Sequence, residues 1–373
     1  MRKIILFKVC VIMLASVCIM FDGCKGSNGQ GGKDTTARTM KSTKAKKKPL
    51  FTPTSAGGPY EVLVVYDSKD LLTGAFDTLY NVLTDDVLGL SQAEPSFDVM
   101  KISSNHFSKN LHLCRNIIIM NIDSRMYTQC KFKYSQNVYA YPQIVMNIQA
   151  PDAESFKRFV KTNHDVIINF FTRAELNHEA GNLKERHNPM IGEKVMNMFG
   201  CEISALPELN KTKTGRNFLW ASTDRVNKDM NFVIYSYPYR DPRTFTDEYF
   251  VRKRDSVMKA NVPGPREGQY MMTTYPFVLF SDETVHGEYA QVARGLWNIK
   301  NYDMGGPFVS VARVDEKNQR VVVVEGFVYS PATDKRNLIR RLEASLYTLR
   351  LPDELDLDRN QFDLDEVIIN PED

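Results

Sequence analysis

The stretch Gly57-Gly-Pro-Tyr-Glu-Val-Leu-Val-Val-Tyr66 marks the start of the folded body of this chain and indicates its fold class. Three turn-forming residues precede a short apolar run rich in β-branched side chains, a pattern typical of a buried strand. Apolar residues at helical spacing follow over 71–83. Further strands are predicted over 97–102, 116–122 and 137–149. Strands that alternate with helices predict an N-terminal α/β lobe over residues 56–206.

A long amphipathic helix is predicted over residues 151–176. Pro151 suits the first turn of a helix, and Asp152 suits its positive end. The aromatic stripe of this helix is typical of a face that packs against a core. A shorter helix is predicted over 190–199. The polar, turn-rich residues 207–216 then provide the best internal boundary.

The sequence after this boundary predicts a second lobe that is richer in strands. Apolar runs separated by turn residues predict strands over 217–223, 230–237, 269–280, 286–299, 307–314 and 319–329. Helices are predicted over 245–260 and from Pro331 to about Leu349. We therefore expect an α+β protein of two lobes, each a mixed or antiparallel sheet packed with amphipathic helices. The C-terminal β-rich lobe is expected to span residues 207–352.

The first 24 residues resemble an export signal that ends in a lipidation motif. Basic residues precede Val9–Phe21, an apolar run of thirteen residues that fits a secretory signal and is too short to span a bilayer. Phe21-Asp22-Gly23-Cys24 then resembles a bacterial lipobox. We predict a lipoprotein signal peptide over 1–23, with lipid, including palmitate, attached to Cys24. The alternatives are an ordinary cleaved signal and an uncleaved anchor helix.

The formal net charge of +3 conceals a strong asymmetry along the chain. Residues 24–55 carry eight Lys/Arg and one Asp, and they read as a disordered basic tether. Residues 353–373 carry nine acids and one Arg, and they read as an acidic tail. Because the body between them is nearly neutral, nucleic acid is excluded as a partner, whereas the tether can lie near an anionic membrane surface.

Three cysteines remain in the exported body, at Cys114, Cys130 and Cys201. An odd number allows at most one disulfide within the chain. Cys114 and Cys130 form the local candidate pair, and three unpaired, mostly buried thiols are the alternative that we favour.

Histidine and acidic clusters do not reach the spacing of a known metal site. His178-Glu179 and His187 come nearest, but the residue four positions after His178 is asparagine, where a zinc helix needs histidine. Asp356-Leu-Asp358 begins like a calcium loop, yet Gln361 and Val367 occupy the positions that require Gly and Glu. We find no hydrolase, phosphate-binding or dinucleotide motif. We therefore expect no catalytic residue, no metal and no cofactor.

The most distinctive local sequence is Arg294-Gly-Leu-Trp297 with Met304-Gly-Gly-Pro-Phe308. Paired glycines allow another chain to approach closely, and proline at the start of a strand costs no ladder hydrogen bond. One interpretation is that Trp297 and Phe308 cover the edge of a core. The functional interpretation is a shallow binding surface formed by Arg294, Trp297, Tyr302, Gly305, Gly306 and Phe308.

Taken together, these residues resemble a known family of Bacteroidetes lipoproteins of uncharacterised function, the domain-of-unknown-function 4837 family. The resemblance rests on Gly58–Val65, Arg115–Ile119, Tyr141-Pro-Gln143 leading into Ala150-Pro-Asp152, Arg294–Trp297 and Met304–Phe308. It covers roughly residues 57–350 as a single domain. It implies a lipid-anchored location in the cell envelope and no established activity.

These observations favour a non-enzymatic lipoprotein that binds a ligand or an envelope protein partner through its β-rich lobe. The alternative is a periplasmic hydrolase, or another enzyme, with a site in the cleft between the lobes. Lys25 directly follows Cys24, and no acidic cluster occurs early in the tether. By resemblance, we expect an outer-membrane location that faces the periplasm.

Overall fold

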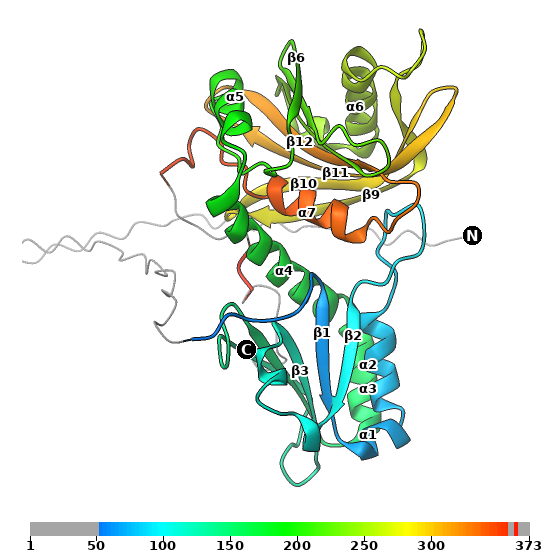
Figure 1. Cartoon of the computed structure of the whole chain (residues 1–373), viewed down its shortest axis with the longest axis vertical. Helices are drawn as coiled ribbons and strands as arrows, with labels where there is room; N and C mark the ends of the chain where they lie inside the picture. The colour runs from blue at the N-terminus through cyan, green and yellow to red at the C-terminus, as the bar shows by residue number, and fades with distance from the viewer. Residues whose placement is uncertain (1–51, 357–361, 365–373) are drawn as a thin grey trace, which may run out of the picture. The chain divides into compact units, whose positions relative to one another are not determined.

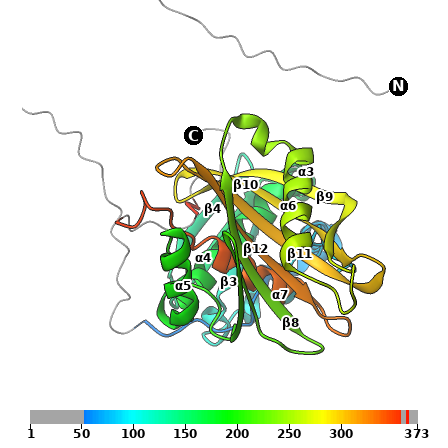
Figure 2. The same ribbon diagram turned by 90° about the horizontal axis from the view of Figure 1, so that it is seen from above.

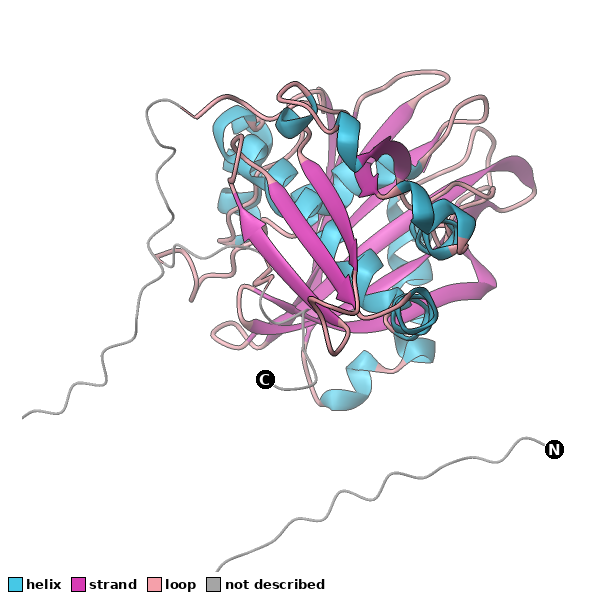
Figure 3. Ribbon diagram, turned by 90° about the horizontal axis from the view of Figure 1, so that it is seen from below, coloured by secondary structure: helices cyan, strands magenta, loops and turns pink. Residues whose placement is uncertain are grey.

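The computed structural model describes residues 52–356 and 362–364. These residues form two lobes, each built on one β-sheet with helices packed beside it (Figures 1 and 3). The prediction of an α+β fold is therefore confirmed. The predicted signal peptide, Cys24 and most of the predicted basic tether lie outside the described residues. Within the described residues, no helix is both long enough and apolar enough to cross a membrane.

The N-terminal lobe contains a five-stranded sheet in the order β2-β1-β3-β5-β4, in which β4 alone is antiparallel to its neighbour. Its strands are β1 (Glu61–Tyr66), β2 (Asp98–Ser103), β3 (Asn116–Ile122), β4 (Lys131–Gln136) and β5 (Ile144–Ala150). Alternate residues of the strands enter two apolar clusters on opposite faces. Helices cover the larger cluster, and the short 3-10 turns η1 (Ser104–His106) and η2 (Leu111–Leu113) lie beside the smaller one.

Among the described residues of this first half of the chain, the helices are α1 (Ser68–Leu72), α2 (Ala75–Leu83), α3 (Ala153–Thr162) and α4 (His164–Arg186). We predicted one helix over 151–176, but the structure divides it at Asn163. Asn163 caps the first helix with φ −102° and ψ 25°, and its side chain donates a 2.8 Å hydrogen bond to the carbonyl of Phe159. The second helix, α4, then continues past the predicted end and through Gly181.

The C-terminal lobe contains a seven-stranded antiparallel sheet in the order β6-β7-β8-β12-β11-β10-β9. Its strands are β6 (Lys211–Gly215), β7 (Phe218–Ser222), β8 (Asp229–Pro238), β9 (Met271–Val285), β10 (Glu288–Ile299), β11 (Tyr302–Asp315) and β12 (Arg320–Tyr329). Its helices are α5 (Pro189–Phe199), the 3-10 turn η3 (Pro242–Phe245), α6 (Asp247–Asn261) and α7 (Arg336–Leu346). Helices α6 and α7 cover opposite faces of this sheet (Figures 1 and 2).

Helix α4 contributes to the cores of both lobes. Phe170 and Phe171, near its start, join the core of the five-stranded sheet, whereas Leu176 and Leu183 join the core beneath the seven-stranded sheet. The helix also packs along α7. Since α7 covers the seven-stranded sheet, the α4–α7 contact connects the two sheets.

The core of the second lobe includes residues before the predicted boundary at 206/207. Ile191, Val195 and Phe199 of α5 pack in the same cluster as the strands of the seven-stranded sheet. An amphipathic helix packs against whichever sheet face its apolar stripe reaches, and its position in the chain does not specify that face.

The segment that we predicted as an acidic tail over 353–373 contains buried residues in the part that the structure describes. Glu354 forms an ion pair with Arg313, and Phe362 and Leu364 are also buried. Phe362 belongs to the core of the C-terminal lobe, and Leu364 belongs to that of the N-terminal lobe. The described part of the tail therefore packs against both lobes through its apolar side chains.

The three cysteines of the described residues are free thiols. Cys114 packs beside one face of the five-stranded sheet and Cys130 beside the other, so the sheet separates the candidate pair. Cys201 is buried in the core of the C-terminal lobe, and burial raises its pKa to about 12.

Candidate functional site

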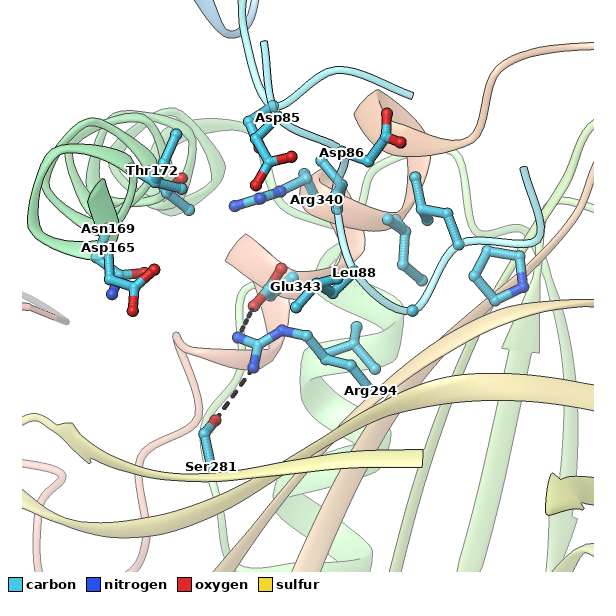
Figure 4. A pocket seen from close by; sticks show the side chains of 18 of the residues that line it. Asp85, Asp86, Leu88, Asp165, Asn169, Thr172, Ser281, Arg294, Arg340 and Glu343 are labelled. Carbon is cyan, nitrogen blue, oxygen red and sulfur yellow. Dashed lines mark hydrogen bonds and ion pairs between the residues drawn. The ribbon is translucent and has the colours of Figure 1, made fainter. Parts of the chain in front are cut away.

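A cavity of about 340 Å³ lies between the two lobes (Figure 4). The loop after α2 and the first turns of α4 line it from the N-terminal lobe, and β9, β10, β11 and α7 line it from the C-terminal lobe. Gly89 adopts a left-handed conformation (φ +84°) in the loop, and an added Cβ would lie 3.3 Å from Cβ of Arg294. This close approach places the loop against β10.

Helix α7 presents a polar stripe to the N-terminal lobe. Arg336, Arg340 and Glu343 lie three or four residues apart and therefore share one face of the helix. The carboxylate of Glu94 accepts hydrogen bonds from the backbone N–H groups of Lys335 and Arg336, at 2.7–2.9 Å, at the start of α7. The Arg336 guanidinium also bonds Asp98 at 2.5 Å. These contacts hold the stripe in place above the cavity.

Arg294 and Glu343 form the fixed ion pair of the cavity. Arg294 Nη2 donates a 2.5 Å hydrogen bond to Glu343 Oε1, and its other contacts are Ser281 Oγ at 3.2 Å and the Tyr347 hydroxyl at 3.1 Å. Burial opposes the charge of Arg294, but Glu343, Tyr347 and Glu283 together outweigh this effect and raise the arginine pKa. Burial likewise acts to raise the pKa of Glu343, but Arg294 and Arg340 together lower it.

Arg340 is the unusual group in the cavity. Its side chain is 9 % exposed, yet among the described residues no hydrogen bond or ion pair reaches its guanidinium. Its nearest specific contact is the ring of Tyr60, with the guanidinium carbon 5.2 Å from the ring centre. Figure 4 shows the guanidinium extending into the space between Asp85 and Glu343. The guanidinium nitrogens are not among the fully buried polar atoms, so they can donate hydrogen bonds to a molecule in the cavity.

Thr172 adds a second polar group that lacks a partner in the described residues. Its hydroxyl oxygen makes no hydrogen bond, and the side chain is only 8 % exposed. The residue lies on α4 and lines the cavity on the side opposite α7 (Figure 4). Most buried side-chain hydroxyls have a partner, so an unsatisfied one in a cavity wall indicates space for a polar ligand or water.

The mouth of the cavity is acidic. His164, the first residue of α4, lies between two carboxylates, with Nδ1 2.8 Å from Asp165 and Nε2 3.0 Å from Asp85. Asp86 also lines the cavity and is exposed. In total, five carboxylates and two guanidinium groups line the cavity. The lining is therefore negative overall, although one buried cation projects into it.

The structure does not bring the six residues of the predicted binding surface together. Trp297 and Phe308 are buried in the cluster between the sheet and α6, where the Arg254 guanidinium lies 3.9 Å from the centre of the Phe308 ring. Arg294 faces the opposite side and lines the cavity, with part of Phe308 also reaching its wall. Tyr302 is exposed at the β10–β11 hairpin.

The two predicted glycines serve the close approach of strands. An added Cβ at Gly305 would lie 2.5 Å from the carbonyl oxygen of Trp297, and one at Gly306 only 2.0 Å from that of Val328. The glycines therefore allow neighbouring backbones to pack within the sheet. Of the six predicted residues, Arg294 and Phe308 line the cavity.

Sequence reasoning missed Arg340, Thr172 and His164. Arg340 looks like a solvated charge on an amphipathic helix, and Thr172 looks like an interruption in an aromatic stripe. A polar residue within an otherwise buried stripe was the available signal at position 172. Nothing local distinguishes Arg340 from Arg341, whose guanidinium instead bonds Glu179 and Glu208.

The second lobe matches a family model. Residues 188–348 match the family model of a domain of unknown function, DUF4837. The C-terminal lobe belongs to the DUF4837 family. Residues 55–184 match a second domain of unknown function, DUF8532. No curated protein matches the chain.

The two family models divide the chain between α4 and α5. The resemblance treated residues 57–350 as one domain, whereas the DUF4837 match begins at residue 188, just before α5. This division agrees with the packing of α5 in the core of the DUF4837 lobe. The cavity is thus lined by residues from both matched regions, with His164 and Thr172 on one side and Arg294 and Arg340 on the other.

Proposed function

We propose that this protein is a non-enzymatic, membrane-anchored binding protein that takes a small polar ligand in the cavity between its lobes. The observation that carries the proposal is the buried Arg340 guanidinium, which has no hydrogen-bond acceptor among the described residues and projects into the cavity. Ligand pockets typically measure roughly 300–1,000 Å³ and combine apolar walls with a few convergent polar groups. A cavity of about 340 Å³ suits a small molecule.

The energetic argument is one of unmet hydrogen bonds. Leaving a buried polar group unsatisfied costs about 1–3 kcal/mol, and more for a charged group. The Thr172 hydroxyl on α4 meets this description. The Arg340 guanidinium, whose nitrogens are not fully buried, approaches the same cavity from α7. A ligand that bonds both groups would offset this cost. The binding site would be preorganised because the neighbouring Arg294–Glu343 pair is already formed.

The arrangement of His164 supports binding over hydrolysis. It is the one histidine of the cavity lining, and both of its ring nitrogens lie within 3.0 Å of carboxylate oxygens. A general base needs a free ring nitrogen within hydrogen-bond reach of the nucleophile that it activates. The enzyme alternative therefore has no specific support from this site.

A panel of small carboxylates, amines, amino acids, sugars and phosphates tests the proposal by calorimetric titration of the full chain. The test variant is Asn169→Trp, since Asn169 is an exposed residue of the cavity lining on α4. The control is Asn182→Trp, at an exposed asparagine of the same helix that does not line the cavity. We expect at least one compound to bind the wild type and the control but not the test variant. Identical titrations of all three proteins would refute a cavity ligand.

We also propose that Cys24 anchors the protein in the outer membrane, where the two lobes face the periplasm. The support is the basic, apolar and lipobox-like order of residues 1–24 together with the basic tether. Intact-mass analysis of the mature protein should give a chain that begins at a lipid-modified Cys24. An unmodified N-terminus elsewhere would contradict the anchor. Protection from added protease in intact cells, and its loss after permeabilisation, tests the side of the membrane.

A further inference from the structure

We propose that the ligand of this cavity is amphoteric: a small molecule that carries both a carboxylate and an ammonium group, such as an amino acid or a short peptide. The inference rests on the proposed binding function and specifies the chemical class of its ligand. It follows from the separation of charge within the cavity, where a buried cation lies inside and carboxylates gather at the mouth.

The inner end of the cavity is suited to a carboxylate. The guanidinium of Arg340 offers donors in a planar fork that can bond both oxygens of one carboxylate. The hydroxyl of Thr172, on the facing wall, can donate a further hydrogen bond. Arg294 is less available because Glu343, Ser281 and Tyr347 already accept hydrogen bonds from it. Arg340 is therefore the primary group for the anionic end of the ligand.

The outer end is suited to an ammonium group. Asp85 and Asp165 share His164 between them, and Asp86 forms no ion pair with any described residue. The carboxylates of Asp85 and Asp165 lie beside the open space into which Arg340 projects, whereas that of Asp86 points away from it (Figure 4). A cation placed there would meet several acceptors.

The charge balance of the lining disfavours purely anionic and neutral ligands. Glu283 is neutralised by Arg173 at 2.6 Å and Glu343 by Arg294, but the aspartates at the mouth leave the site negative. A phosphate or a dicarboxylate would bring two negative charges into this field, which disfavours its binding. A neutral sugar would offer Arg340 hydrogen-bond acceptors but no negative charge. An amphoteric molecule matches both ends.

Three four-carbon probes that differ only in their end groups test the inference: 4-aminobutyrate, succinate and 1,4-diaminobutane. Glycylglycine and L-lysine widen the amphoteric set, and inorganic phosphate tests a compact anion. Each is titrated calorimetrically into the full chain at low ionic strength. We expect saturable binding by at least one amphoteric probe and an affinity at least tenfold weaker for succinate, 1,4-diaminobutane and phosphate.

Substitutions then test which residues bind the anionic end of the ligand and which bind its cationic end. Arg340→Met should weaken binding of the amphoteric probe at least tenfold, whereas Arg252→Met, at an exposed arginine of α6, should leave it unchanged. Asp86→Asn should weaken the same probe several-fold. Thr172→Val separates a loss of binding from a loss of folding. Replacing an unpartnered hydroxyl with a methyl group should leave the melting temperature of the free protein unchanged or higher. This variant should still lose affinity.

The possible outcomes separate this inference from the function on which it rests. If only a sugar, a phosphate or a dicarboxylate binds, and Asn169→Trp abolishes that binding, the cavity is a ligand site and the amphoteric class is wrong. If no compound distinguishes the wild type from Asn169→Trp, both proposals fail. Binding of an amphoteric probe that is insensitive to both Arg340→Met and Thr172→Val would also overturn the assignment.

Discussion

The ring of Phe362 meets the ring of Tyr347 edge-on, with the ring centres 4.7 Å apart and the planes at 75°. Asn177 of α4 also bonds the backbone of Phe362 through both its amide nitrogen and its amide oxygen, at 2.9 and 3.1 Å. Phe362, which is close to the C-terminus, thus packs against α4 and against Tyr347, just beyond the end of α7. Since the Tyr347 hydroxyl accepts from Arg294, this contact also supports the wall of the cavity.

Phe362→Ala should lower the free energy of unfolding by about 3 kcal/mol, because the ring is buried and its removal leaves a cavity. Urea denaturation of the full chain measures the effect. The matched control is Phe277→Ala, since Phe277 is 64 % exposed and its loss should cost less than about 0.5 kcal/mol. Equal losses in the two variants would show that Phe362 is not part of the core.

Gly306→Ala and Gly181→Ala should have opposite effects on stability. An added Cβ at Gly306 would lie 2.0 Å from the backbone oxygen of Val328, so we expect a loss of at least about 2 kcal/mol. At Gly181, inside α4, nothing lies within 4 Å, and alanine should gain roughly 0.5–1 kcal/mol through its helix propensity. Thermal melts compare the three proteins. If Gly306→Ala left the stability unchanged, close packing of the strands would not require this glycine, and the binding role predicted from the sequence would stand.

Glu175→Gln should destabilise the N-terminal lobe. The buried carboxylate of Glu175 accepts hydrogen bonds from Arg115, from the Asn116 side chain and from the backbone N–H of Tyr60. An amide cannot neutralise Arg115 and brings a donor where an acceptor is required, so we expect a loss of about 2–4 kcal/mol. Glu193→Gln, at an exposed position of α5, is the control. Equal denaturation midpoints would contradict this role.

Stability should fall between pH 6.5 and pH 4 through His286, in the β9–β10 hairpin. Burial, followed by the nearby charge of Arg313, lowers the pKa of His286 from 6.5 to about 4. As the pH falls, His286 therefore takes up a proton in the unfolded chain before it does so in the folded protein. The contribution of neutral His286 to folding stability is fully present above pH 6.5 and declines as the pH falls toward 4. At pH 5, the free energy of unfolding should be lower than above pH 6.5 by roughly 1–2 kcal/mol because of His286.

His286→Asn tests the assignment, since asparagine tolerates the positive φ of 56° at this position. Denaturation at pH 7 and pH 5 should show a smaller loss in the variant than in the wild type. Carboxylates affect both proteins alike, so the difference between the two losses isolates the histidine. Equal losses would assign the pH dependence to other groups.

The strands and the helix faces were predictable because burial imposes a local period. The run from Val321 to Val324 alternates between two buried faces of the sheet, and the apolar stripe from Leu338 to Leu346 places one face of α7 in the core. In both cases, neighbouring residues carry the whole signal. The division of the long helix was not predictable in this way, because it depends on the capping contact of one asparagine side chain.

The candidate site was only partly predictable, because its members come from distant segments. Arg294 was singled out from its surroundings in the sequence, but its partner Glu343 looks like any other acid of an amphipathic helix. The same holds for His164, whose role depends on Asp85 arriving from the loop after α2. The local sequence pattern predicts neither the distances between such groups nor their burial.

By itself, the sequence determined the two-lobed α+β architecture, the near-neutral body and the exclusion of familiar catalytic motifs, because these follow from composition and local periodicity. The tertiary structure alone decided that Trp297 and Gly306 pack within the sheet and that Phe362 is buried. It also decided that Arg340 lines a cavity and forms no hydrogen bond with another described residue. The physical reason is that the hydrogen-bond partners of a side chain, and its exposure to water, depend on which distant segments meet when the lobes pack together.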